Sequence, residues 1–281
     1  MKKHARHPLV VAAVTLAVAV AIHALLGMAG AQEGPDWKEG LPRQHKSIWL
    51  VHDPDRPKPP PVEPGLHRDA PPSDAIVLFD GTDISSWERH RREGGDAEWK
   101  VESGYMEVND TGSIRTRESF RDCQLHLEYM APTPPREKSQ ARGNSGIIFM
   151  GLFEVQVLDN RDNATYADGY IGAVYGQHPP IVNAGRKPGE WQTYDIVFRA
   201  PRFEGDDLVE PARLTVFLNG VVVQHNAEVY GEVAWRRLAQ YGRPREEGPL
   251  VLQDHGDKQS VRFRNVWLRK LDLSPEALDN Q

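Results

Sequence analysis

The chain has 281 residues, a formal net charge of −6 at pH 7 and one cysteine, Cys123. The acidic balance argues against a nucleic-acid-binding protein, and a single cysteine excludes an internal disulfide. The length is sufficient for one large hydrophobic core, which makes a disulfide framework unnecessary. Cys123 stands in an alternating apolar stretch, so we expect it to be a small buried hydrophobic residue.

The amino-terminal segment, 1–31, has the pattern of an export signal. Basic residues precede an apolar run over 9–22, and Ala29-Gly30-Ala31 forms a small-residue cleavage motif. We predict cleavage after Ala31 and a periplasmic or secreted mature protein. The alternative is an uncleaved membrane anchor, for which the apolar run is marginal in length.

Residues 32–72 form a proline-rich lead-in. The prolines between Pro54 and Pro64 lie among charged residues, which favours an extended polyproline II path. We expect a strap or tether that is partly docked on a following domain. That domain is predicted over 73–273, with a tail over 274–281.

Short apolar or alternating runs, separated by Gly and Asp or Asn turns, fill the predicted domain. Asn219-Gly220 between two apolar runs is the strongest hairpin signal. Only 234–241 has helical character. The pattern predicts one all-β domain, an antiparallel β-sandwich of jelly-roll size. The expected strands are 76–79, 99–101, 105–108, 124–130, 146–150, 153–158, 173–175, 191–199, 213–218, 221–224, 250–253 and 261–271.

Two expected strands meet at Gly151 and carry a row of polar residues. With a side-chain period of two, Glu154 and Gln156 point to one face, and Asp159 follows at the strand end. The preceding turn contributes Arg142 and Asn144. Such a row can bind a metal, act as acid and base, or hydrogen-bond a polyol. It can also be an ordinary solvent-facing strand surface.

The long loop from Asp159 to Asn183 is a second candidate region. Tyr166 and Tyr175 offer apolar ring faces with polar tips, which suit sugar rings, and its glycines permit close approach of a ligand. The alternative is a self-packed surface loop.

A third candidate region follows the apolar strand at 250–253. This strand delivers Gln253, Asp254 and His255 at its end. His255 can take and give a proton near neutral pH, and an adjacent carboxylate would fix its tautomer. The alternative is a structural histidine, and neighbouring strand residues point oppositely, so one of Asp254 and His255 is expected to be scaffold.

Taken together, these motifs resemble the 3-keto-disaccharide hydrolase domain family (DUF1080) over about Ser73 to Leu271. The segments that carry the resemblance are Leu78-Phe79-Asp80-Gly81, Gly143-Asn144-Ser145-Gly146-Ile147, Glu154-Val155-Gln156-Val157-Leu158-Asp159, Gly189-Glu190-Trp191, Leu218-Asn219-Gly220, Leu252-Gln253-Asp254-His255-Gly256 and Phe263-Arg264-Asn265-Val266. The resemblance implies a concanavalin A-like sandwich that binds carbohydrate on its concave face. It places the polar cluster on Asn144, Glu154, Gln156, Asp159, Gln253 and His255.

A 3-keto sugar suggests a definite chemistry. The carbonyl at C3 acidifies the hydrogen at C2, so a base can form an enolate that expels the C1 leaving group. Glu154 or His255 is the candidate base, Asp159 the acid partner or metal ligand, and Asn144 or Arg142 the enolate stabiliser. A divalent cation, Ca²⁺ or similar, held by Glu154, Asp159 and His255 is an alternative stabiliser.

No Gly-x-Gly-x-x-Gly dinucleotide motif lies between a strand and a helix pattern, so we expect no NAD site of that kind. A separate oxidoreductase must then introduce the 3-keto group. Two other functions stay open at this point. One is a carbohydrate-binding module without turnover; the other is a conventional glycosidase in which Glu154 and Asp159 form the carboxylate pair.

Overall fold

The computed structural model describes residues 40–67, 69–91, 94–256, 260–274 and 277. The predicted signal peptide lies outside these residues. The chain divides into two compact units, 1–59 with 275–281, and 60–274. In the described part of the first unit, Arg43 and Leu50 form an isolated bridge. No helix in the described ranges is long and apolar enough to cross a membrane.

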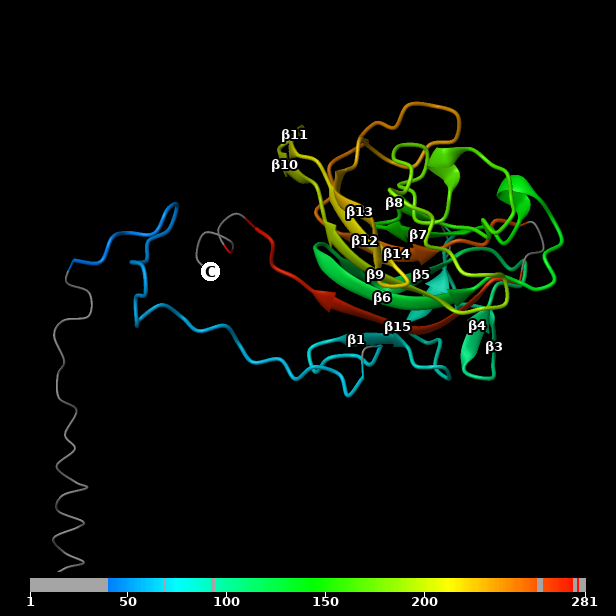
Figure 1. The fold of residues 1–281 in the computed structure, drawn as a ribbon, viewed down its shortest axis with the longest axis horizontal. Helices are drawn as coiled ribbons and strands as arrows, with labels where there is room; N and C mark the ends of the chain where they lie inside the picture. Colours follow the sequence, from blue (N-terminus) through cyan, green and yellow to red (C-terminus); the bar gives the residue numbers. More distant parts are fainter. Residues whose placement is uncertain (1–39, 68, 92–93, 257–259, 275–276, 278–281) are drawn as a thin grey trace, which may run out of the picture. The chain divides into compact units, whose positions relative to one another are not determined.

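The second unit is a sandwich of two antiparallel sheets (Figure 1). The larger sheet has the order β13-β12-β9-β6-β15-β4-β3, with β1 also paired to β15, and the smaller has the order β2-β5-β14-β7-β8. A separate hairpin joins β10 to β11. The strands in the described chain are β1 (Ile76–Phe79), β2 (Trp87–Arg89), β3 (Lys100–Glu102), β4 (Tyr105–Glu107), β5 (Ile114–Phe120), β6 (Cys123–Met130), β7 (Ser145–Phe149), β8 (Phe153–Val157), β9 (Gln192–Arg199), β10 (Arg202–Glu204), β11 (Asp207–Glu210), β12 (Arg213–Leu218), β13 (Val221–Glu228), β14 (Gly248–Leu252) and β15 (Arg262–Lys270).

The core lies between the two sheets, where the alternating apolar residues of each strand meet. Phe149 of β7 stacks on Phe198 of β9, with ring centroids 4.7 Å apart. Cys123 is buried in the same core, and burial raises the pKa of its thiol. The predicted all-β, antiparallel sandwich fold is therefore confirmed.

The Asn219-Gly220 hairpin is also confirmed. Leu218 pairs with Val221 across the turn, and both turn residues have positive φ, 53° for Asn219 and 80° for Gly220. This geometry is that of a type I′ turn, which matches the right-handed twist of the flanking strands.

Part of the proline-rich lead-in is attached to the larger sheet. Asn265 Nδ2 and Trp267 Nε1 of β15 donate to the carbonyl oxygen of Asp69 at 2.7 and 3.2 Å. Arg269 also forms an ion pair with Asp74. These contacts hold residues 69 and 74 against the larger sheet, within the unit 60–274.

Two connections on one side of the sandwich contribute to the candidate site. The segment 229–247 after β13 and the long connection after β8 lie together (Figure 1). Gln177 Nε2 donates to Gly231 O at 3.0 Å, and Tyr230 N donates to Gln177 Oε1 at 2.6 Å. The expected helical character of 234–241 is wrong, because this stretch is a turn followed by irregular chain.

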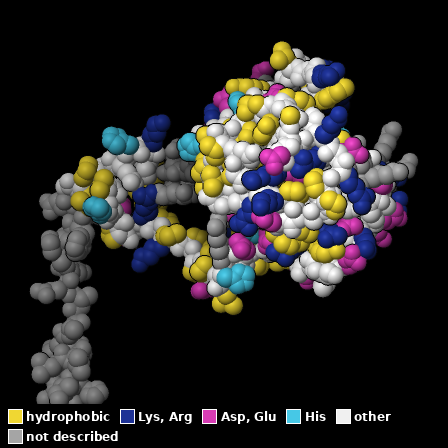
Figure 2. Space-filling view, turned by 45° about the vertical axis from the view of Figure 1, so that its right-hand side comes forward, with side chains coloured by type: hydrophobic (Ala, Val, Ile, Leu, Met, Phe, Trp, Pro, Cys, Tyr) yellow, Lys and Arg dark blue, Asp and Glu magenta, His cyan; other side chains and the backbone are white. Residues whose placement is uncertain are grey.

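Charged side chains of both signs are interspersed over the face of the molecule shown in Figure 2. Basic residues there alternate with Asp and Glu instead of forming one broad basic surface.

Candidate functional site

The floor of the site is the face of the smaller sheet that points away from the core. In β8, Phe153, Val155 and Val157 belong to the core, so Glu154 and Gln156 leave the sheet on the other face. Gly146 pairs with Gln156, and Ile148 pairs with Glu154. The isolated bridge between Val155 and Val174 continues the sheet by one further short segment. The alternation predicted for 153–158 therefore places the polar row as expected.

Tyr175 lies beside Glu154 in this extended sheet. The register of the Val155–Val174 bridge sets Tyr175 opposite Glu154, and Tyr175 N donates to Glu154 O at 3.1 Å. Directly opposed residues in antiparallel strands project to the same face with Cβ atoms about 5 Å apart. The phenol of Tyr175 and the carboxyl group of Glu154 consequently project side by side from the same face of the sheet.

Glu154 is a buried carboxyl group with a strongly raised pKa. Its side chain is 5% exposed, and no hydrogen-bond or ion-pair partner holds its carboxyl group within the described residues. Burial raises the pKa of Glu154 from its ordinary 4.5 to about 8. The group is therefore poised to exchange a proton near neutral pH, as catalytic acids and bases do.

An amide cluster shares this site with Glu154. Gln156 Nε2 lies 3.0 Å from Gln140 Oε1 and 3.4 Å from Asn144 Oδ1, and Asn144 Nδ2 donates to Gln140 O at 2.5 Å. The buried Oε1 atoms of Gln156 and Gln253 have no donor among the described residues. Buried acceptors of this kind are costly unless a ligand satisfies them, and hydroxyl groups of a sugar can do so.

A cavity of about 550 Å³ lies above this floor. Its size is that of a small-molecule site. His255 reaches its wall from the strand end after β14, whereas Asp254 points elsewhere and accepts from Gly112 N at 2.9 Å. The wall consists of Gln140, Ala141, Asn144, Glu154, Gln156, Tyr166, Tyr175, Val233, Trp235, Gln253 and His255.

Aromatic side chains form the upper part of the wall. The hydroxyl groups of Tyr166 and Tyr175 lie 2.8 Å apart. Trp235, from the segment after β13, is 65% exposed. Apolar ring faces above a polar floor are the arrangement that a pyranose ring requires.

Asp159 and Arg142 do not contribute to this wall. Arg142 Nε lies 2.7 Å from Asp159 Oδ2, in a pair whose side chains are 13% and 2% exposed. Asp159 Oδ1 also accepts from Arg161 N at 2.9 Å, and Arg142 Nη2 donates to Arg161 O at 2.7 Å. These contacts fasten the start of the long loop, so both side chains are engaged in structure.

Asn183 also lies away from the cavity. It is exposed, and its Oδ1 accepts from Gly185 N at 3.1 Å. The predicted metal ligands Glu154, Asp159 and His255 do not come together either. The described part of the chain contains no group of three His, Cys, Asp or Glu side chains arranged to hold a metal ion. The residues present thus do not fit the divalent cation considered from the sequence.

Gln140 and Trp235 are site residues that sequence reasoning missed. Gln140 lies in a short 3₁₀ turn, Ser139–Ala141, within a stretch rich in proline and charge. Trp235 lies in the stretch for which a helix was expected. Neither residue carries a local signal of function, because the two loops that hold them meet only in the folded chain.

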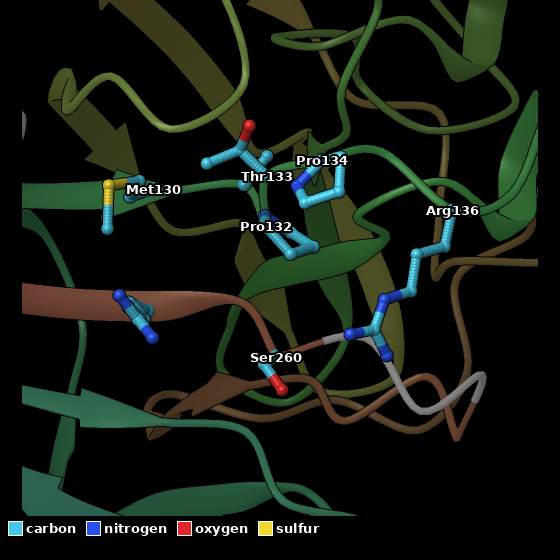
Figure 3. Close-up of a pocket in the computed structure, with 8 residues that line it drawn as sticks. Met130, Pro132, Thr133, Pro134, Arg136 and Ser260 are labelled. Carbon is cyan, nitrogen blue, oxygen red and sulfur yellow. The ribbon is translucent and has the colours of Figure 1, made fainter.

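A second, smaller cavity lies after the end of β6 (Figure 3). Its volume is about 180 Å³, below the range of most ligand sites. Met130, Pro132, Thr133, Pro134, Arg136 and Ser260 surround it. None of the predicted site residues contributes to it, so the candidate site is the cavity above Glu154.

The chain is similar to a protein family and to several solved structures. Residues 74–269 match the family described as the 3-keto-alpha-glucoside-1,2-lyase-like domain. A crystal structure of a candidate glycosyl hydrolase from Parabacteroides distasonis is 45% identical, with a TM-score of 0.73, and the match covers 77% of this chain and 93% of that one. No curated protein matches the chain.

Two further structures from Parabacteroides distasonis, also described as candidate glycosyl hydrolases, share the fold. They are 22% and 21% identical, with TM-scores of 0.53 and 0.50. The matches cover 71% and 70% of this chain and 94% and 99% of the others. Together with the cavity, these findings support a carbohydrate-active function. The chain belongs to the family of 3-keto-alpha-glucoside-1,2-lyase-like domains.

Proposed function

We propose that the protein cleaves the C1–O bond of 3-keto-glycosides by elimination across C1 and C2, with Glu154 as the base. The observation that carries this proposal is a buried carboxyl group without a described partner, inside a cavity lined by amides and aromatic rings. The description of the family, a 1,2-lyase acting on a 3-keto-glucoside, names the same two carbon atoms.

The burial that raises the pKa of Glu154 also makes its carboxylate a stronger base than one in water. In the first step, Glu154 takes the hydrogen at C2 as a proton. The C–H electron pair forms a double bond between C2 and C3, and the carbonyl pair moves onto the C3 oxygen. The resulting enolate needs a hydrogen-bond donor or a proton at that oxygen.

His255 is the second titratable side chain that we assign to the reaction. It lines the same cavity as Glu154 but comes from the segment that follows β14. An imidazole at the C3 oxygen would donate a hydrogen bond to the enolate. The amide groups of Asn144, Gln156 and Gln253 would bind the remaining hydroxyl groups, with the two unpartnered Oε1 atoms as acceptors.

In the second step, the enolate pair reforms the C3 carbonyl, a double bond forms between C1 and C2, and the C1–O pair leaves with the aglycone oxygen. Water that adds across this double bond would complete a net hydrolysis. The same site therefore accounts for either a lyase or a hydrolase outcome. Oxidation at C3 must be supplied by a separate oxidoreductase, and we propose that the reaction takes place outside the cytoplasm after cleavage at Ala31.

Two other functions are less well supported by the geometry. A conventional glycosidase needs a second carboxylate facing Glu154 across the sugar, but Asp159 is engaged with Arg142. A carbohydrate-binding module would use the amides and rings, but it gives no reason for a carboxyl group whose burial costs free energy.

The test is incubation of the purified protein with a 3-keto-glucoside and with its unoxidised parent. We expect release of the aglycone from the keto substrate and none from the parent. Cleavage of both compounds would favour the conventional glycosidase. Binding of the parent without turnover of either would favour the binding module.

A further inference from the structure

A larger cavity, of about 690 Å³, adjoins the one that contains Glu154. The cavity that contains Glu154 is called the inner cavity below, and the larger one the outer cavity. The two share four residues, Gln140, Tyr166, Tyr175 and Trp235. The outer cavity extends from these residues toward Asp168 and Arg237, away from the polar floor. A ligand in the inner cavity can therefore continue into the outer one past the two tyrosines.

We propose that the outer cavity is a leaving-group subsite for a second pyranose ring, and that Tyr175, at the junction, gives the departing oxygen its proton. This inference rests on the proposed function and assigns its leaving-group side to named residues. It also supplies the acid that Asp159 does not provide.

The wall of the outer cavity suits a sugar ring. Trp235 is 65% exposed and Tyr166 is 43% exposed, so both rings present apolar faces to solvent. Ser139, Asp168 and Arg237 add polar groups along the same wall. Apolar ring faces for the C–H surface of a pyranose, with polar groups for its hydroxyls, form the usual pattern of sugar recognition.

Trp235 is held in place by its own loop. The Arg236 guanidinium lies over the indole ring, 4.7 Å from its centroid. Arg236 has a φ of 53°, in the left-handed region that a non-glycine residue seldom adopts. A strained residue that is kept beside a cavity is a recurrent mark of a functional site. The contacts of Gln177 with Tyr230 and Gly231 tie this loop to the segment that carries Tyr175.

Tyr175 lies where the bond between the two rings would be. It lines both cavities and stands opposite Glu154 in the sheet. Burial, followed by the hydrogen bond with Tyr166, raises the pKa of Tyr175, so the phenol keeps its proton until a stronger base forms beside it. The oxygen of a departing sugar, as the C1–O bond breaks, is such a base.

The proton balance closes without a further reactant. Glu154 gains the proton from C2, and Tyr175 loses one to the leaving oxygen, which departs as a free alcohol. Tyr166 lies 2.8 Å from Tyr175 and is exposed, so it can return a proton from solvent to the phenolate. Glu154 then releases its proton to water, and both groups are restored.

The test compares two 3-keto-glucosides that differ in the leaving group. One is a 3-keto-disaccharide, whose sugar oxygen needs a proton to depart. The other is the 4-nitrophenyl 3-keto-glucoside, whose nitrophenolate departs readily without one. Tyr175→Phe should lower kcat/KM for the disaccharide roughly 10²- to 10⁴-fold and lower that for the nitrophenyl compound by less than about tenfold. An equal loss on both substrates, or no loss on either, would overturn the role of Tyr175.

A second variant tests the subsite. Trp235→Ala should raise KM for the disaccharide about 2- to 10-fold. The matched control is Trp191→Ala, which removes a tryptophan that also lies under an arginine, Arg264, at 4.0 Å, but lines neither cavity. An equal effect of both variants on KM would overturn the subsite. If the wild-type protein cleaves neither keto substrate, the proposed function itself fails, which is a distinguishable result.

Discussion

The carboxyl group of Glu154 occupies the space above Gly146 in which any other residue would carry its side chain. A Cβ atom built on Gly146 would lie 2.3 Å from Glu154 Oε1 and 2.9 Å from its carboxyl carbon. Gly146 is paired with Gln156, which lies two residues beyond Glu154 in β8. The absence of a side chain at residue 146 is thus what lets the carboxyl group lie flat on the sheet under the cavity.

Gly146→Ala should displace this carboxyl group and lower kcat/KM by roughly 10²-fold, since small misplacements of a reacting group have effects of that order. The overpacking should cost about 1–3 kcal/mol of stability. Steady-state kinetics and thermal unfolding measure the two effects. As a control, Gly146→Ala made in the Glu154→Gln background should bring little further loss of activity, because the group that it displaces is already inactive.

The pH dependence of the rate should report Glu154. A base must be ionised, so kcat/KM should rise with pH and level off above a midpoint near 8, the raised pKa of this residue. Glu154→Gln should remove this rise of kcat/KM with pH and lower the rate roughly 10²- to 10⁴-fold. A rate that falls as the pH passes through 8 would instead make Glu154 a general acid.

The same group links stability to pH in the opposite direction from an ion-paired carboxylate. Between pH 4.5 and about 8 the folded protein retains a proton on Glu154 that the unfolded chain has lost. Stability therefore falls as the pH rises through this window. Glu154→Gln has no carboxyl group to ionise at this buried position, so its stability should not fall in this window. Its unfolding free energy should therefore exceed that of the wild type by roughly 3–5 kcal/mol above pH 8 and match it near pH 4. Thermal unfolding of both proteins from pH 4 to pH 9 tests the difference; parallel curves would contradict it.

The Arg142–Asp159 pair should matter for stability and much less for chemistry. Asp159→Asn leaves a buried guanidinium without its carboxylate, which should cost about 3–5 kcal/mol. The folded fraction of this variant should keep the wild-type midpoint in its pH–rate profile. Loss of activity as complete as that of Glu154→Gln, in a variant that is still folded, would return Asp159 to the catalytic residues.

The sequence predicted strands well where apolar residues alternate and turn residues delimit them. The Asn219-Gly220 hairpin and the strand 213–218 are found where they were expected. β5 was missed because its sequence, IRTRESF, is mostly polar. Arg115 in this strand pairs with Glu88, and the buried Thr116 Oγ1 accepts from Leu250 N at 3.0 Å. Such partners are supplied by other strands, so no local pattern reveals them.

Within the site, period-two alternation was enough to place Glu154 and Gln156 on one face. It was not enough for Asp159, which follows the strand end, where the backbone turns and Arg142 takes up the carboxylate. Trp235 comes to the cavity from another connection 81 residues beyond Glu154 in the numbering, through contacts that only the folded chain makes. The long loop did bring Tyr166 and Tyr175 to the cavity as expected, but left Asn183 outside it.

The role of Glu154 can be examined through the fate of the hydrogen at C2. The purified protein is incubated with a 3-keto-glucoside in deuterated water, and both the sugar and the released aglycone are followed by NMR. Wild-type protein should remove the C2 hydrogen as it releases the aglycone, which leaves an eliminated product without hydrogen at C2 or, after addition of water, a product with deuterium there. Glu154→Gln should neither remove this hydrogen nor release the aglycone. Release of the aglycone with the original C2 hydrogen retained in the sugar product would contradict proton abstraction at C2.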